Sequence, residues 1–175
     1  LKNPVLIGLS RFLETRCYRA ASRIVTLSPG MADHIRERHG IDYLVSVPNA
    51  ADNEFWPVHD PDWELPDWAH DKKLALYTGN IGAINNSGLL FEAATLLMER
   101  GRDDIRIVLI GDGQEKERLL RRAEEEGVTA FRILDIMPKT ELRNWLQRSM
   151  CSVVPLQANP IPDTPPPNKP FDPMP

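Results

Sequence analysis

Two glycine-rich turns are the parts of this sequence whose residue types could bind a phosphate or a sugar. The first, Gly79-Asn80-Ile81-Gly82, follows an apolar run that ends at Thr78 and precedes a helical pattern that starts near Ser87. Glycine lets the backbone approach a phosphate closely, and the N-terminus of the next helix offers N–H groups and a positive dipole end. The second, Gly111-Asp112-Gly113, follows the next apolar run. It could seat a ribose or a base, or it could be a tight turn only, and both interpretations stay open at this point.

The spacing of these glycines disfavours two common classes of nucleotide-binding protein. Gly79 and Gly82 are spaced wrongly for a GxGxxG fingerprint, and Lys116 stands where a third glycine after Gly111 and Gly113 would belong. A nicotinamide-dependent dehydrogenase is therefore disfavoured. The sequence also contains no GxxxxGK motif followed by serine or threonine, which disfavours a P-loop enzyme.

Composition argues against a metal centre and a nucleic-acid partner. His34 and His39 lie five residues apart on a predicted helix and so not on one face, which makes a metal site unexpected. The net charge of −4 lacks the basic balance of nucleic-acid binding proteins. Cys17 and Cys151 stand alone in apolar surroundings, so we expect both to be reduced core residues of a cytoplasmic protein.

The two turns lie in a segment where strand and helix patterns alternate. We predict strands at 74–78, 105–110, 131–134 and 151–155, and helices at 87–100, 115–126 and 139–147. Such alternation implies βαβ units with right-handed crossovers. Residues 73–156 therefore predict an α/β fold with a parallel Rossmann-like sheet and flanking helices, in which ligands bind beyond the carboxyl ends of the strands.

The remaining residues form three further segments. Residues 1–49 predict helices at 4–21 and from Pro29 to Gly40, with short strands at 24–27 and 43–47. Residues 50–72 read as an interdomain linker whose tryptophans, Trp56, Trp63 and Trp68, pack onto the flanking domains. Residues 157–175 form a proline-rich tail that is nearly incapable of forming a helix, and we expect it to be mobile.

The first helix carries an apolar stripe with several arginines beside it. Val5, Leu6, Leu9, Phe12 and Leu13 recur at helical spacing, and Arg11, Arg16 and Arg19 accompany them. We expect the stripe to pack into a core. A helix of this kind can also lie on an anionic membrane surface, and this peripheral membrane contact is the alternative use.

Six short motifs follow one another along the chain in an order that resembles one enzyme family. They are Ile24-Val25-Thr26-Leu27-Ser28, Val47-Pro48-Asn49-Ala50-Ala51-Asp52, Tyr77-Thr78-Gly79-Asn80-Ile81-Gly82, Leu109-Ile110-Gly111-Asp112-Gly113, Val153-Val154-Pro155-Leu156 and Asn168-Lys169-x-Phe171-Asp172. The pattern resembles the family-four retaining glycosyltransferases of the glycosyltransferase-B fold, most of all a subgroup that builds bacterial polysaccharides. The resemblance implies the end of an N-terminal acceptor domain in residues 1–49 and a partial donor-binding domain in residues 73–156.

The resemblance also implies which residues contact a nucleotide-sugar donor. They are Gly79, Asn80, Gly82, Gly111, Asp112, Gly113, Thr164, Lys169 and Asp172. The basic pair that many members use to neutralise the donor diphosphate falls on Asn80 and on Asn85 or Asn86, so we expect Lys169 to supply this charge. The family's two acids, eight residues apart, fall on Thr164 and Asp172, of which Asp172 resembles the acid that binds the donor ribose. No catalytic residue is assigned.

The resemblance leads to one functional hypothesis with two alternatives. As part of a full-length enzyme, the chain would help to transfer a sugar from a nucleotide-diphosphate donor to a lipid-linked or glycan acceptor, without a metal or a cofactor. The chain alone is expected to be an inactive fragment. The alternatives are a nucleotide-sugar epimerase of the same fold and a non-catalytic nucleotide-binding remnant.

Overall fold

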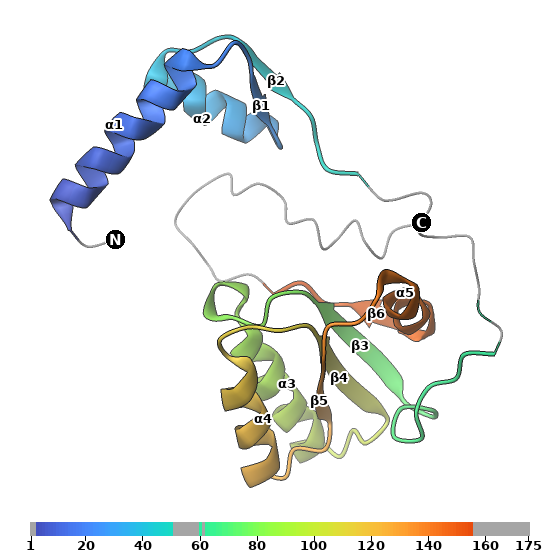
Figure 1. Cartoon of the computed structure of the whole chain (residues 1–175). Helices are drawn as coiled ribbons and strands as arrows, with labels where there is room; N and C mark the ends of the chain where they lie inside the picture. Colours follow the sequence, from blue (N-terminus) through green and yellow to red (C-terminus); the bar gives the residue numbers. More distant parts are fainter. Residues whose placement is uncertain (1–2, 51–59, 61, 156–175) are drawn as a thin grey trace. The chain divides into compact units, whose positions relative to one another are not determined.

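The computed structural model of the chain describes residues 3–50, 60 and 62–155 (Figure 1). Contacts divide the described residues into a first unit that ends at Ala50 and a second unit that follows it. No helix within these residues is long and apolar enough to cross a membrane. The proline-rich tail, including Thr164, Lys169 and Asp172, lies outside the described residues, and so does Trp56.

The first unit has two helices and a two-stranded parallel sheet. In chain order these are α1 (Pro4–Ala20), β1 (Ile24–Thr26), α2 (Pro29–His39) and β2 (Leu44–Ser46), with β1 pairing β2. α2 begins where the sequence predicts, because the Ser28 hydroxyl accepts a 3.2 Å hydrogen bond from the backbone N–H of Met31. Ile24, Ile35 and Ile41 form the small core of this unit.

Two sequence-based expectations, one about α1 and one about the two cysteines, are wrong. The apolar stripe of α1 does not pack into a core, since no residue of α1 is buried in the described structure. Cys17 on α1 is exposed, as is Cys151 in the second unit, so neither cysteine is a core residue. Apolar neighbours in the sequence do not reveal which side of a helix or strand faces the protein.

The second unit is a parallel sheet with helices in the crossovers. Its elements are β3 (Lys73–Thr78), the 3₁₀ turn η1 (Ala83–Asn85), α3 (Ser87–Glu99), β4 (Ile105–Ile110), α4 (Lys116–Glu125), β5 (Phe131–Leu134), α5 (Lys139–Arg148) and β6 (Cys151–Ser152). The strand order is β5-β4-β3-β6 and all three pairings are parallel. The chain thus adds β4 and β5 on one side of β3 and then returns past it to place β6 on the other. The predicted α/β fold with a parallel sheet and flanking helices is confirmed, although β6 is shorter than the predicted strand 151–155.

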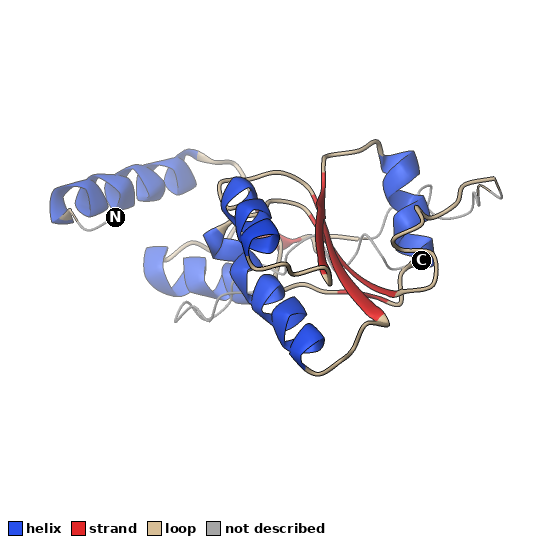
Figure 2. Cartoon of the chain, turned by 90° about the horizontal axis from the view of Figure 1, so that it is seen from below, coloured by secondary structure: helices blue, strands red, loops and turns tan. Residues whose placement is uncertain are grey.

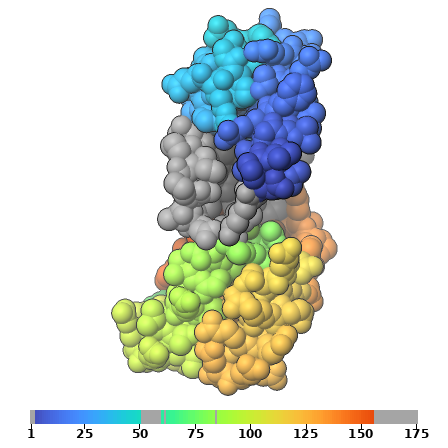
Figure 3. Space-filling view, turned by 90° about the vertical axis from the view of Figure 1, so that its left-hand side faces the viewer, coloured from blue at the N-terminus to red at the C-terminus, as the bar shows by residue number. Residues whose placement is uncertain are grey.

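Helices cover both faces of this sheet, which makes three layers (Figures 1 and 2). On one face, Tyr77, Ile107 and Leu109 of the strands pack against Phe91 of α3 and Leu119 of α4. α3 and α4 lie side by side over this face, as the space-filling view also shows (Figure 3). The alternation of side chains along each strand sends the residues between them to the opposite face.

The opposite face is covered by α5 and by the tryptophans that precede β3. Leu74, Leu76, Val108 and Ile110 of the strands contact Trp145 of α5 on this side. Trp68 stacks on Trp145 with ring centroids 5.8 Å apart, and Trp63 meets it edge-on at 5.5 Å. Trp63 and Trp68 therefore pack onto the flanking sheet domain, as expected. With both faces buried, the carboxyl edge of the sheet is where its loops can form a binding site.

Candidate donor-binding site

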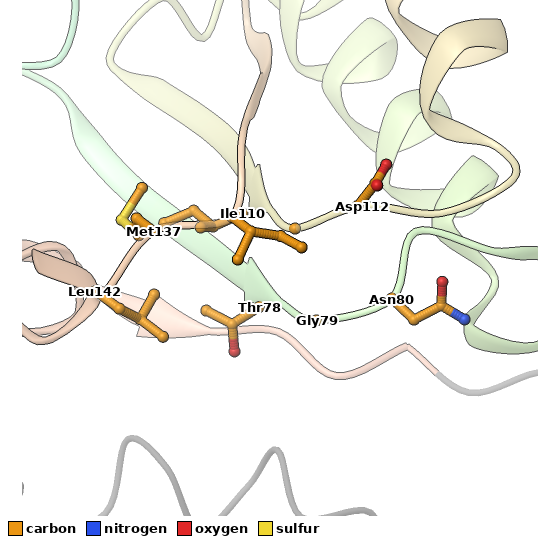
Figure 4. A pocket seen from close by; sticks show the side chains of 9 residues that line it. Thr78, Gly79, Asn80, Ile110, Asp112, Met137 and Leu142 are labelled. Carbon is orange, nitrogen blue, oxygen red and sulfur yellow. The ribbon is translucent and has the colours of Figure 1, made fainter. Parts of the chain in front are cut away.

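A cavity of about 390 Å³ lies at the carboxyl edge of the sheet in the second unit. Its lining residues come from the ends of β3 and β4, from the segment between β5 and α5, and from α5 itself: Thr78, Gly79, Asn80, Ile110, Gly111, Asp112, Ile136, Met137 and Leu142. Figure 4 shows Met137 and Leu142 toward one end, Asn80 and Asp112 toward the other, and Ile110 between them. The cavity thus combines an apolar end with a polar end, next to the place where the strand order reverses.

The two glycine turns interlock beside this cavity. The Gly79 N–H donates to the Ile110 carbonyl at 2.9 Å, and the Ile81 N–H donates to the Asp112 carbonyl at 2.7 Å. A Cβ at Gly111 would lie 2.0 Å from the Gly79 carbonyl oxygen, and one at Gly113 would lie 2.3 Å from that of Ile81. Both glycines also have a φ of +153°, which other residues rarely adopt. Gly111 and Gly113 are therefore required for the close packing of one turn against the other.

The backbone N–H groups of these turns are largely used within the chain. Gly82 N–H donates to the Ser87 hydroxyl at 3.1 Å, Gly111 N–H to the Leu134 carbonyl at 3.1 Å, and Gly113 N–H to the Asp112 carboxylate at 2.8 Å. Groups that are already paired make poor additional donors to a phosphate. Polar contacts to a ligand in this cavity would therefore come mainly from side chains, those of Thr78, Asn80 and Asp112.

Tyr77 fixes the position of the Asn80 backbone through a hydrogen bond. Its hydroxyl donates a 2.6 Å hydrogen bond to the Asn80 carbonyl, which also accepts one from the Asn85 side-chain amide at 2.9 Å. Burial raises the pKa of Tyr77 to about 12, so the hydroxyl stays protonated and remains a donor. With its carbonyl held twice, the Asn80 backbone is fixed and its side chain is presented at the polar end of the cavity.

A lysine and two aspartates stand at the cavity's edge. Lys116 at the start of α4 pairs with Asp135, which follows β5, and its ammonium lies 4.0 Å from the Asp112 carboxylate. The hydrogen bond to Asp135 raises the pKa of Lys116, so this lysine is charged. Two carboxylates outweigh one ammonium here. This edge therefore suits ligand groups that donate hydrogen bonds, such as sugar hydroxyls, better than it suits a phosphate.

The structure brings together part of the site that the sequence predicts. Gly79, Asn80, Gly111 and Asp112 line the cavity, whereas Gly82 and Gly113 lie in the same turns without lining it. Three further predicted residues lie outside the described part of the chain: Thr164, Lys169 and Asp172. The expected role of Lys169, to neutralise the donor diphosphate, therefore stays a prediction.

Sequence reasoning missed the apolar end of the cavity. Ile136 and Met137 belong to the connection after β5 and Leu142 belongs to α5, and neither part of the chain carries a glycine signal. The parallel order of the strands could have indicated this segment, because all carboxyl ends of such a sheet meet at one edge.

Within the described residues, no three His, Cys, Asp or Glu side chains are grouped so that they could hold a metal ion.

Comparison with protein families gives one match over more than half of the chain. The model described as "Glycosyl transferases group 1" matches residues 64–164, which include every residue that lines the cavity. A comparison with curated protein sequences found no match.

Several solved glycosyltransferase structures share the fold of this chain. Staphylococcus aureus TarM, solved with fondaparinux, α-GlcNAc-glycerol and UDP, aligns with a TM-score of 0.61 at 12% identity over 82% of this chain and 27% of its own. HepE of Anabaena, solved with UDP, gives 0.59 at 12% identity over 79% and 39%. The sucrose-phosphate synthase of Thermosynechococcus elongatus gives 0.62 at 14% identity over 86% and 39%. The chain thus spans well under half the length of these proteins. At this identity the likeness shows the fold, and it confirms the predicted glycosyltransferase-B architecture.

Proposed function

The chain belongs to the glycosyl transferases of group 1, and we propose that it supplies the donor-binding part of a retaining glycosyltransferase. The full-length enzyme would transfer a sugar from a nucleotide-diphosphate donor to a hydroxyl group of a lipid-linked or glycan acceptor. The observation that carries the proposal is the cavity at the carboxyl ends of β3, β4 and β5, in a chain of this family. The family match gives no support to the epimerase alternative.

The shape and lining of the cavity support a nucleoside as its occupant. About 390 Å³ lies within the roughly 300–1,000 Å³ of typical small-molecule sites. The apolar side chains of Ile110, Met137 and Leu142 would contact the flat face of a base. Asp112 would accept hydrogen bonds from ribose or sugar hydroxyls at the polar end. TarM and HepE were solved with UDP, which makes uridine diphosphate the first ligand to test.

The chemistry proposed for this chain is stabilisation of the departing diphosphate. Negative charge develops on the leaving group during sugar transfer, and donors fixed in advance around it lower the barrier. In the first turn, the side-chain amide of Asn80 is proposed to donate a hydrogen bond to the diphosphate. Lys169 is proposed to add the positive charge. The reaction is proposed to need neither a metal nor a cofactor. Positioning of donor and acceptor would supply the rest of the rate enhancement.

The acceptor and the cellular location form the finer part of the proposal. The motif order resembles enzymes of bacterial polysaccharide synthesis, so we propose a lipid-linked or glycan acceptor for the full-length enzyme. We propose the cytoplasm as its location, with which the two free cysteines agree, because thiols persist in reducing compartments. The residues that hold the acceptor and perform the transfer are not assigned within this chain.

The donor site can be tested by nucleotide titration followed by nuclear magnetic resonance. We expect UDP to bind the chain weakly, with a Kd on the order of 1 mM, since the chain carries only part of the site proposed for the full enzyme. The largest amide shifts should fall on residues 78–80, 110–112 and 136–142. The variant Leu142→Trp, which fills the apolar end of the cavity, should abolish these shifts.

The control for this titration is Leu96→Trp, which places the same side chain at a half-exposed position of α3 away from the cavity. It should leave the shifts unchanged. If UDP shifts other residues most strongly, or if Leu142→Trp and Leu96→Trp behave alike, the donor-site assignment fails. Binding without any sugar transfer by the full-length protein would favour the non-catalytic alternative.

A further inference from the structure

The outer side of α1 carries an uncovered apolar face. This face, called here the α1 apolar face, consists of Val5, Leu6, Leu9, Phe12 and Leu13, whose exposed fractions run from 47% to 75%. A row of large apolar side chains on one side of a helix normally packs against other parts of the protein. Nothing in the described part of the chain buries this one, and so a partner is expected for it.

α1 is attached to its own unit through a different side. The Thr15 hydroxyl lies 3.1 Å from Nδ1 of His39 on α2, and the ring of Tyr18 meets the His39 ring edge-on at 5.1 Å. The Tyr43 hydroxyl donates a 2.9 Å hydrogen bond to the Tyr18 carbonyl. These contacts lie in the C-terminal half of the helix, where it adjoins α2 in Figure 1. The α1 apolar face is therefore not needed to hold the helix in place.

The charges on α1 single out a partner of negative charge. Arg11, Arg16 and Arg19 are exposed on the helix, and Arg23 follows it, whereas Glu14 is its one acidic residue. Glu14 is also engaged, because it accepts a 3.4 Å hydrogen bond from the Tyr18 hydroxyl and lies 3.9 Å from the His39 ring. The helix is thus positive on a chain whose net charge is −4. A second copy of this chain would present another positively charged helix, and like charge disfavours self-association through this face.

We propose that α1 binds the surface of a lipid bilayer that contains anionic headgroups. Apolar side chains enter the boundary between headgroups and acyl chains, while Arg16 and Arg19, which flank the apolar face at helical spacing, contact the lipid phosphates, as in other interfacial helices. With 17 residues, α1 is roughly 25 Å long, enough to lie in the plane of the interface. Each arginine near an anionic surface raises the affinity about fivefold. The proposal goes beyond the donor site and does not depend on it, since it concerns a surface of the other unit.

Vesicle sedimentation tests the proposal. We expect the chain to sediment with vesicles of phosphatidylcholine mixed with phosphatidylglycerol, and to stay in solution with phosphatidylcholine alone. The double variant Leu9→Gln and Phe12→Gln should weaken binding at least about tenfold, because it removes two of the inserted side chains. The matched control is Leu89→Gln with Leu96→Gln, two equally exposed leucines of α3, each 49% exposed, which should bind as the unsubstituted chain does.

A second variant keeps the test decisive if the first one misfolds. Arg16→Gln with Arg19→Gln leaves the apolar face intact and should weaken binding to anionic vesicles by more than about tenfold. Circular dichroism establishes that each variant is folded. Equal sedimentation of the α1 variants and the control overturns the proposal, and so does equal binding to both kinds of vesicle. A dimer in solution that the Leu9 and Phe12 variant dissociates, without vesicle binding, assigns the face to a second copy and also overturns it.

Discussion

Gly111→Ala should strongly destabilise the second unit, because this position joins the two turns of the candidate site. Gly111 has a φ of +153°, and an alanine Cβ there would lie 2.0 Å from the Gly79 carbonyl oxygen. Ordinary contacts of this kind begin at 3.4 Å, so the turns would have to separate by more than 1 Å. The atoms that must move belong to the backbone and have no rotamer to escape into.

The magnitude follows from two contributions. Holding a residue other than glycine in such a backbone conformation costs about 1–3 kcal/mol. Separating the turns also weakens the hydrogen bonds from Gly79 N–H to the Ile110 carbonyl and from Gly111 N–H to the Leu134 carbonyl, each worth about 1 kcal/mol. Together the loss is about 3–5 kcal/mol, which for a chain of this size lowers Tm by roughly 10 °C.

Thermal unfolding followed by circular dichroism measures this loss. The matched control is Gly127→Ala, because Gly127 also has a positive φ, +64°, but its added Cβ would meet no atom within 4 Å. The control should cost about 1–2 kcal/mol, from backbone conformation alone. If the two variants unfold within about 2 °C of each other, the interlocking of the turns does not contribute as described.

Three further substitutions test other parts of the structure. Trp145→Ala should lower the free energy of unfolding by about 3–5 kcal/mol in urea titrations, since Trp145 is buried between the sheet, Trp63 and Trp68. Arg143→Met should raise it by about 1 kcal/mol or more, because Arg143 Nε is buried without a hydrogen-bond partner in the described structure; a marked decrease would mean that the guanidinium is paired. The hydrogen bond from Arg106 lowers the pKa of Asp103, so the carboxylate stabilises the fold above pH of about 4 and this contribution is lost as the pH falls further. Urea midpoints between about pH 5 and 2 should therefore fall less steeply for Asp103→Asn than for the unsubstituted chain, and parallel slopes would refute this.

Local patterns were sufficient to predict the elements of this fold. The start of α2 follows from Ser28 and Pro29, which satisfy and pre-shape the first turn wherever the helix lies in the protein. The strands of the second unit carry apolar runs on both faces, and the helices between them carry one-sided patterns, which together imply a parallel sheet with two covering layers. The edge where ligands bind then follows, and with it the place of Gly79, Asn80, Gly111 and Asp112.

The site itself required contacts between residues that are distant in the sequence. In the sequence, the glycines of the second turn fit a ribose or base contact as well as they fit a tight turn. Only the packing of Gly111 on Gly79 and of Gly113 on Ile81 shows that they let the turns interlock. Ile136, Met137 and Leu142 were missed because an apolar side chain gives no sign of whether it fills a core or lines a cavity.

The sequence by itself determined the order of strands and helices, the α/β class and the edge of the sheet that carries the candidate site, because these depend on local backbone preferences and on apolar periodicity. The tertiary structure decided which side of each element meets the protein. In α1, the periodicity marks an apolar face correctly, but only the contacts of Thr15 and Tyr18 with His39 show that the helix is held by its other side. Periodicity is a property of one element, whereas burial is a property of at least two.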